Sequence, residues 1–174
     1  DGEKVVRWKP PFPSGVQVAD LALYRADALS PDAPAVVICE GEPATDALAE
    51  VADSLGIVAV GTVTGASTTP GDAALSPLLD RAVILWPDND EPGRQHMAKI
   101  ASRLHARGGQ DMRIINWLDA PPAGDAADAI TPGVDIKGLL ANAQVWQPNQ
   151  NPDADDGSKL TPANIGLGLI ASGY

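Results

Sequence analysis

The chain has 174 residues, 44% of them hydrophobic, and a formal net charge of −11. This length suits one domain with a buried core. The acidic balance argues against a large nonspecific nucleic-acid footprint, because such binding depends on lysine and arginine releasing counterions from phosphates. No stretch approaches the roughly 20 apolar residues of a membrane span, so we expect no membrane partner. The lone cysteine, Cys39, excludes a disulfide within the chain and favours a reducing cytoplasm.

The first 34 residues read as an irregular appendage ahead of the main domain. Residues 5–8 favour a short strand, a proline cluster at 10–13 breaks it, and residues 19–29 favour a short helix. The chain begins with Asp1 and carries no signal peptide pattern. We therefore expect a piece of a longer polypeptide that has neighbouring domains.

The main domain is expected over residues 35–143, where strands and helices alternate. The apolar runs lie at 35–39, 57–60, 82–86 and 112–117, and helix-like segments separate them. Such alternation predicts right-handed crossovers and a mostly parallel sheet. The fold class is therefore α/β, a compact Rossmann-like arrangement of about four parallel strands flanked by helices.

Two helices are predicted with particular clarity between these runs. The first spans about 43–55 and ends at Gly56, and the second spans 91–107 and ends at the glycine pair 108–109. Proline is tolerated in a first helical turn and glycine commonly follows the last one, which agrees with both sets of bounds. The positions expected to be buried are Ala47, Leu48, Val51 and Leu55 in the first helix and Met97, Ile100, Ala101 and Leu104 in the second.

Candidate acidic ligands follow the first and the third of the apolar runs. Glu40 follows the run at 35–39, and both Asp88 and Asp90 follow the run at 82–86. Because open parallel sheets form their ligand crevice at the carboxyl ends of the strands, we expect these side chains at one shared rim. Several carboxylates there would repel one another unless a cation lay between them, and Mg²⁺ suits such oxygen ligands. Asp90 taken alone could instead only cap the following helix.

Two further segments are expected at the same rim. Residues 61–67 follow the second apolar run and combine glycines with hydroxyls, which suits a loop that approaches a ligand closely. Thr62 and Thr64 are its candidate contacts, and a plain connection is an equal alternative. Asp125 and Asp128 follow the last apolar run and would add two more carboxylates.

This order of motifs resembles a TOPRIM domain, most closely that of phage- and plasmid-type primases and primase-helicases. The resemblance covers about residues 35–130. It depends on Val-Ile-Cys-Glu-Gly-Glu at 37–42, Gly-Thr at 61–62, Trp-Pro-Asp-Asn-Asp-Glu-Pro-Gly-Arg at 86–94 and Gly-Asp-Ala-Ala-Asp at 124–128.

The resemblance implies a metal-dependent site in a four-stranded sheet. Glu40 would be the general acid/base or a metal ligand, and Asp88 and Asp90 would hold Mg²⁺ or Mn²⁺. These three are the expected catalytic residues. Asp125 matches a further acid that several such primases place after the last strand, and it is the fourth expected metal ligand. Asp46, on the first helix, has a weaker claim.

The chain departs from the family pattern in two places. Pro87 precedes the first aspartate, and Glu42 and Pro43 replace the bulkier or basic residues often found after Glu-Gly. No zinc-binding module or basic amino-terminal subdomain is evident before residue 35, although basic residues there are candidates for a remnant of such a surface. The expected nucleic-acid or nucleotide contacts are Lys4, Arg7, Lys9, Thr62, Thr64 and Arg94. For Arg94, a structural role on its own helix is an equal alternative.

The activity that the resemblance implies is nucleotidyl transfer in DNA replication. The chain would be the catalytic module of a primase or primase-helicase, joining nucleoside triphosphates into short RNA primers on single-stranded DNA in a bacterial or phage-infected cytoplasm. Its partners would include adjacent zinc-binding and helicase domains. A TOPRIM nuclease that hydrolyses phosphodiesters with the same acids is a second enzyme class, and a non-catalytic metal- or template-binding module is the alternative without turnover.

Residues 144–174 are expected to form a linker and C-terminal tail, because they are rich in Asn, Pro, Asp and Gly. His96 and His105 lack metal-ligand spacing, so we expect packing or surface roles. Trp86 and Trp117 end apolar runs and are expected to fill the core or the rim. A tryptophan ring beside the acidic crevice could also stack on a base.

Overall fold

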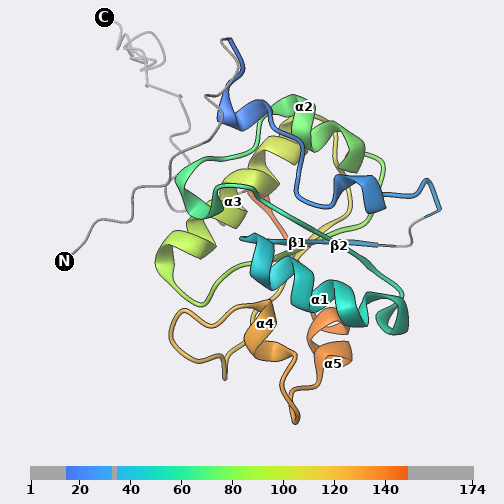
Figure 1. Ribbon diagram of the computed structural model, residues 1–174, viewed down its shortest axis with the longest axis vertical. Coiled ribbons are helices and arrows are strands. Elements are labelled where there is room, and N and C mark those ends of the chain that lie inside the picture. The colour runs from blue at the N-terminus through green and yellow to red at the C-terminus, as the bar shows by residue number, and fades with distance from the viewer. Residues whose placement is uncertain (1–14, 33–34, 149–174) are drawn as a thin grey trace, which may run out of the picture.

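The computed structural model describes residues 15–32 and 35–148 (Figure 1). The strands are β1 Val36–Cys39, β2 Val58–Gly61, β3 Val83–Trp86, β4 Met112–Ile114 and β5 Gln144–Val145. The α-helices are α1 Glu42–Leu55, α2 Asp72–Leu75, α3 Glu91–Ala106, α4 Ala126–Ala129 and α5 Ile136–Ala141. Short 3-10 turns are η1 Val18–Asp20, η2 Ala26–Ala28, η3 Gly65–Ser67 and η4 Ser76–Leu78.

The strands form one sheet in the order β2-β1-β3-β4-β5. The first four strands are parallel, and β5 pairs antiparallel with β4. The predicted α/β class and its four parallel strands are confirmed. The fifth strand was not predicted, and with it the main domain extends past the expected boundary at 143.

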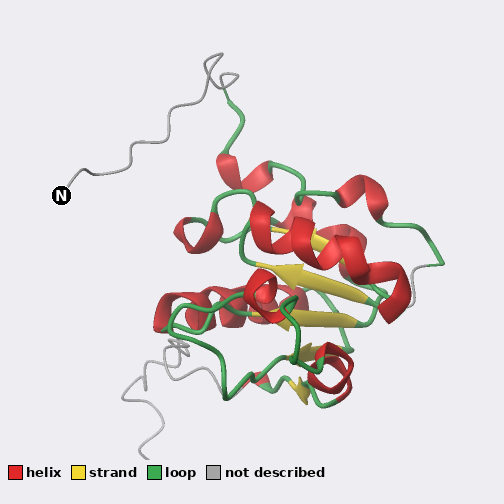
Figure 2. Ribbon diagram, turned by 60° about the horizontal axis from the view of Figure 1, so that its bottom comes forward, coloured by secondary structure: helices red, strands yellow, loops and turns green. Residues whose placement is uncertain are grey.

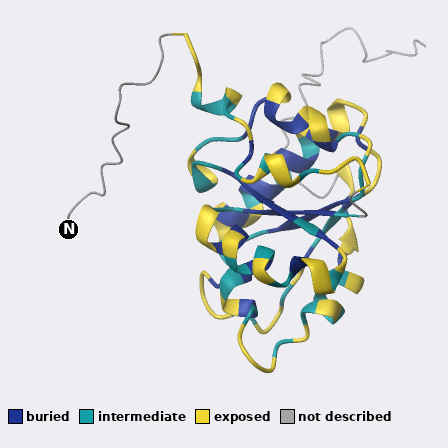
Figure 3. Cartoon of the chain, turned by 45° about the vertical axis from the view of Figure 1, so that its right-hand side comes forward, coloured by how far each residue is buried: buried dark blue, intermediate teal, exposed yellow. Residues whose placement is uncertain are grey.

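Helices cover both faces of the sheet (Figure 2), so successive residues of each buried strand enter two different cores. In β1, Val36 and Ile38 pack with α2 and α3, whereas Val37 and Cys39 pack with α1 and α4. The three central strands β1, β2 and β3 are accordingly among the most buried parts of the molecule (Figure 3). Burial raises the pKa of the Cys39 thiol to about 12, which fits an unreactive structural cysteine.

The helix predictions differ in how well they placed the buried face. In α3 the predicted stripe is fully buried. In α1 only Leu48 of the predicted stripe is fully buried, and the buried face is centred instead on Ala44, Thr45 and Ala52. The small side chains permit close approach to the sheet, since a Cβ at Gly61 of β2 would overlap the Thr45 hydroxyl.

The segment before β1 packs on the domain but does not form a helix over 19–29, so this helix prediction is wrong. Arg25 adopts a left-handed conformation with φ 59°, and this interrupts any helix between η1 and η2. Leu23 is buried in the core beside α3, and the backbone of Tyr24 exchanges hydrogen bonds with Gly61.

The last described residues also belong to the domain. Trp146 is buried, and its backbone N–H donates to Met112 O at 2.9 Å. The rest of the expected tail, 149–174, lies outside the described residues. Among the helices that the structure describes, none is long and apolar enough to cross a membrane.

Candidate functional site

Glu40 and Asp88 emerge side by side from neighbouring strands. Glu40 follows β1 directly, Asp88 follows β3 after one proline, and the parallel register pairs Cys39 with Trp86. Parallel strands direct their carboxyl ends to one edge, so both acids lie at the same rim.

The Glu40 carboxylate is half-buried and only partly satisfied. Its Oε1 accepts a hydrogen bond from the Ala66 N–H at 3.1 Å, whereas Oε2 is buried without a hydrogen-bond partner among the described residues. Burial raises the pKa of Glu40, the hydrogen bond from Ala66 opposes the rise, and the charge of Asp90 adds to it. A proton or a cation would therefore be favoured at this carboxylate.

The carboxyl group of Asp88 is half-buried and is affected by the charges of the other acids. Burial, and then the negative charges of Glu40, Asp125, Asp90 and Asp128, raise its pKa from 3.8 to about 7. The acids from three chain segments thus act on one another electrostatically.

Gly93 explains how α3 can begin so close to these acids. A Cβ at this position would lie 2.8 Å from Asp88 O and 2.8 Å from Glu40 Oε2. Real Cβ atoms do not approach so closely, so the first turn of α3 requires a residue without a side chain. This steric requirement explains why the Asp-x-Asp-x-x-Gly-Arg motif has a glycine at this position.

Several of the acids also cap helices. Asp90 is the N-cap of α3, and its Oδ1 accepts from the Gly93 N–H at 2.7 Å. Asp125 caps α4, accepting from the N–H groups of Ala127 and Asp128, while Asp128 accepts from the Asp125 N–H. The capping alternative for Asp90 is therefore realised, although its charge still acts on Glu40 and Asp88.

Asn89 is a site residue that the sequence analysis did not identify. Its side-chain amide donates to Ala120 O at 2.9 Å and to Pro121 O at 3.0 Å, and its backbone N–H donates to Gly124 O at 2.9 Å. These bonds fix the loop that carries Asp125 beside the Asp88 segment. The one sequence feature that could have pointed to Asn89 is the position of its amide side chain between Asp88 and Asp90.

The loop after β2 supports Glu40 from the other side. Thr62 is 1% exposed, and its hydroxyl donates to the Glu40 carbonyl oxygen. Thr64 is partly buried and donates to Thr68 O at 3.4 Å. With the bond from Ala66, this loop positions the glutamate; direct contacts of either threonine with a nucleotide stay predictions.

The remaining predicted residues are placed as follows. Arg94 is exposed, pairs with Glu91 at 3.2 Å, and borders a pocket of about 260 Å³ beside Asp88. Lys4, Arg7 and Lys9 lie outside the described residues.

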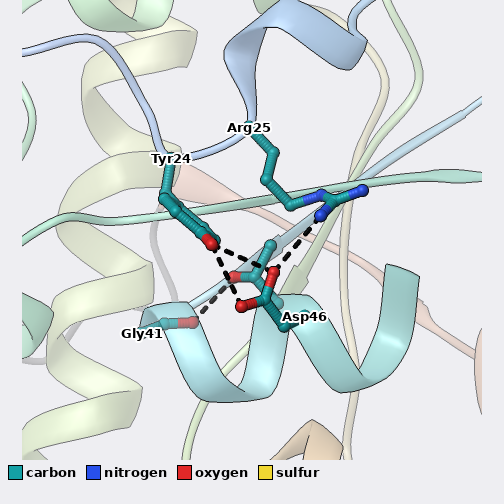
Figure 4. Close-up of polar contacts among 5 residues, drawn as sticks. Tyr24, Arg25, Gly41 and Asp46 are labelled. Atoms are coloured by element: carbon teal, nitrogen blue, oxygen red, sulfur yellow. Dashed lines mark hydrogen bonds and ion pairs between the residues drawn. The ribbon is translucent and has the colours of Figure 1, made fainter. Parts of the chain in front are cut away.

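Asp46 makes contacts away from the strand ends. It accepts from Tyr24 Oη at 3.0 Å and from Arg25 at 3.2 Å, both of which reach α1 from the segment before β1 (Figure 4). In this structure its carboxylate anchors that segment.

Within 15–32 and 35–148, no three His, Cys, Asp or Glu side chains are already gathered as a metal-binding group. The sequence matches no protein-family model and no curated protein. The fold and the site define the class of this protein as a Rossmann-like α/β domain with partly buried acidic side chains at the carboxyl ends of its parallel strands.

Proposed function

We propose that this domain is the catalytic TOPRIM module of a primase or primase-helicase, which synthesises short RNA primers on single-stranded DNA with Mg²⁺ or Mn²⁺. The observation that carries the proposal is the position of Glu40 and Asp88 at the same ends of the paired strands β1 and β3, where burial, and then the charges of acids from three chain segments, raise the pKa of Asp88 to about 7. A rim of this kind is suited to a divalent cation, and a cation beside an acid/base suits phosphoryl chemistry.

The donor chemistry at the rim fits such a cation. The side chains are carboxylates, the hard oxygen ligands that Mg²⁺ and Mn²⁺ prefer. Glu40 Oε2 is buried and has no hydrogen-bond partner among the described residues. Asp88, Asp90 and Asp125 are the residues that would hold the ion, with the second oxygen of Asp90 left for it by the capping bond, and Glu40 stays beside them as the proton acceptor.

In the proposed reaction, the 3′-hydroxyl of a growing strand attacks the α-phosphorus of a nucleoside triphosphate. A phosphodiester bond forms, the bond to the leaving oxygen breaks, and pyrophosphate departs. Glu40 accepts the hydroxyl proton, a role that its raised pKa favours. The cation, when bound, neutralises charge on the phosphates and lowers the pKa of the attacking hydroxyl.

Three residues act by positioning in this proposal. The hydroxyl of Thr62 and the N–H of Ala66 fix Glu40, and Asn89 fixes the segment of Asp125. Adjacent zinc-binding and helicase domains in a longer chain, and a cytoplasmic setting in a bacterial or phage-infected cell, complete the proposal.

The test incubates the chain with a single-stranded template, nucleoside triphosphates and Mg²⁺ or Mn²⁺. We expect short oligoribonucleotides, and we expect Asp88→Ala/Asp90→Ala to abolish them. The matched control is Asp53→Ala/Asp80→Ala, which removes two exposed carboxylates at the opposite end of the strands. Cleaved template would indicate a nuclease, and metal uptake without any product would indicate a non-catalytic binding module; either result rejects the primase proposal.

A further inference from the structure

A pocket opens beside Asp88 at the carboxyl ends of β3 and β4. Its volume is about 260 Å³, and its walls come from the segment after β3, the segment after β4, the start of α3 and β5. Asp88 itself borders the pocket, so a molecule bound there would lie next to the acidic rim.

The apolar part of the wall is aromatic and aliphatic. Trp86 and Ile115 are buried, and Trp117 is partly buried against the same core. Trp117 thus presents a ring that the core holds in place while part of it stays accessible. A fixed aromatic ring in a pocket wall is a stacking surface for a planar ligand.

The polar part of the wall suits a ring with hydrogen-bonding edges. Asn116 and Gln144 are exposed, border the pocket, and make no side-chain hydrogen bond within the described residues. Each amide carries both donors and an acceptor, so each can meet the edge of a heterocycle.

The positive charge of Arg94 favours a ligand that carries a negatively charged group. Arg94 borders the pocket, and among the described residues its guanidinium pairs only with Glu91, an exposed partner within the same helical turn. Exposed pairs of this kind contribute little, so the guanidinium is available to an incoming phosphate. A cationic ligand, by contrast, would have to approach Arg94.

We propose that this pocket binds the base of the incoming nucleoside triphosphate, with Trp117 as the stacking surface; the role of that nucleotide as substrate rests on the proposed function. The volume is slightly below the range of about 300–1,000 Å³ typical of whole drug-sized ligands, so it holds a base rather than a complete nucleotide. The sugar and phosphates would then extend past Asp88 and Arg94 to the rim.

The test compares Trp117→Leu, which keeps apolar bulk without a ring, with Trp117→Phe, which keeps a ring. Binding of ATP and of inorganic tripolyphosphate, each with Mg²⁺, is measured by calorimetry. Trp117→Leu should weaken ATP binding about tenfold or more, while the phenylalanine variant stays close to the wild type. Tripolyphosphate binding should not change in either variant. Equal ATP affinity in wild type and Trp117→Leu would overturn the proposal.

A second measurement uses the wild-type chain without metal. Adenosine should shift the NMR signals of the Asn116 and Gln144 side-chain amides. The absence of any shift would overturn the proposal. A shift produced by oligothymidylate but not by adenosine would also overturn it and would assign the pocket to the template strand. These readouts separate the two proposals. Adenosine binding without primer synthesis would support the base-binding pocket and contradict the primase function. Primer synthesis with unchanged ATP binding in Trp117→Leu would support the primase function and contradict the base-binding pocket.

Discussion

Gly93 lies where α3 comes closest to the two acids at the rim, and its lack of a side chain is testable. Alanine favours helix by about 1 kcal/mol over glycine, so propensity alone predicts a more stable protein after Gly93→Ala. The new Cβ would meet Asp88 O and Glu40 Oε2, each at 2.8 Å. We therefore expect a loss of about 1–3 kcal/mol in the free energy of unfolding, and a loss of about 10- to 100-fold in Mn²⁺ affinity.

Gly41→Ala is the control for this substitution. Gly41 also follows a rim acid, but the nearest atom to its new Cβ would be Pro43 Cδ at an ordinary 3.7 Å. Urea unfolding and titration calorimetry compare the two variants. A Gly93→Ala protein that is as stable as the wild type and binds Mn²⁺ equally well would refute the steric explanation.

His96 is a second residue whose environment has a measurable consequence. It is 2% exposed on α3, and neither ring nitrogen has a hydrogen-bond partner in the described part of the chain. Burial, with a smaller effect from the charge of Lys99, lowers its pKa from 6.5 to about 4. The folded state therefore resists protonation more than the unfolded state does, and stability falls as the pH drops from about 6.5 towards 4.

His96→Leu should remove this part of the acid sensitivity. The difference in unfolding free energy between the variant and the wild type should shift in favour of the variant by about 3 kcal/mol between about pH 7 and pH 4. His105→Leu is the control, because His105 lies exposed on the same helix beside Trp146. Parallel pH profiles for His96→Leu and the wild type would show that His96 is not the sensitive group.

At the scale of elements, the segment before β1 is held by an apolar contact more than by its polar ones. Leu23 is buried, so Leu23→Ala should cost about 2–5 kcal/mol. The contacts of Asp46 with Tyr24 and Arg25 are exposed, and Asp46→Ala should cost at most about 1 kcal/mol. Urea unfolding measures both, and an Asp46→Ala cost equal to that of Leu23→Ala would reverse this ranking.

The elements that could be predicted are those with a local signal. The parallel strands β1, β2 and β3 are short apolar runs between breakers, and α3 repeats its buried side chains at helical spacing. By contrast, β5 has two exposed residues, Gln144 and Val145, and exists because β4 offers an unpaired edge. The buried face of α1 likewise depends on Gly61, which belongs to another element.

The site residues that could be predicted are likewise those with a local signal in the sequence. Glu40 and Asp88 could be assigned to one rim because strand ends carry topological information. The bonds of Asn89 to Ala120 and Pro121, and of Thr62 to the Glu40 backbone, join segments more than twenty residues apart. No spacing along the chain encodes such contacts, so only the folded structure identifies these two as positioning residues.

At the scale of the whole molecule, the acidic rim opposes folding when no cation is present. The pKa of Asp88 rises to about 7 from an ordinary 3.8, so the folded state binds this proton more tightly than the unfolded state does. Its stabilising effect is present at low pH and is lost as the pH rises from about 4 through about 7. Above that range the charge of the partly buried carboxylate is poorly hydrated and also faces its acidic neighbours, and the net charge of −11 adds to the repulsion.

Asp88→Asn should therefore separate stability from metal binding. At about pH 8 without metal, the variant should be more stable than the wild type by about 1–2 kcal/mol, less than the full pKa shift because water screens a half-exposed carboxylate. Near pH 4 the advantage should vanish, since Asp88 is then neutral. Mn²⁺ at a hundredfold excess over its dissociation constant should stabilise the wild type by about 2.7 kcal/mol and the variant far less. Thermal unfolding with and without Mn²⁺ measures all three effects, and equal stabilisation of both proteins would place the ion elsewhere.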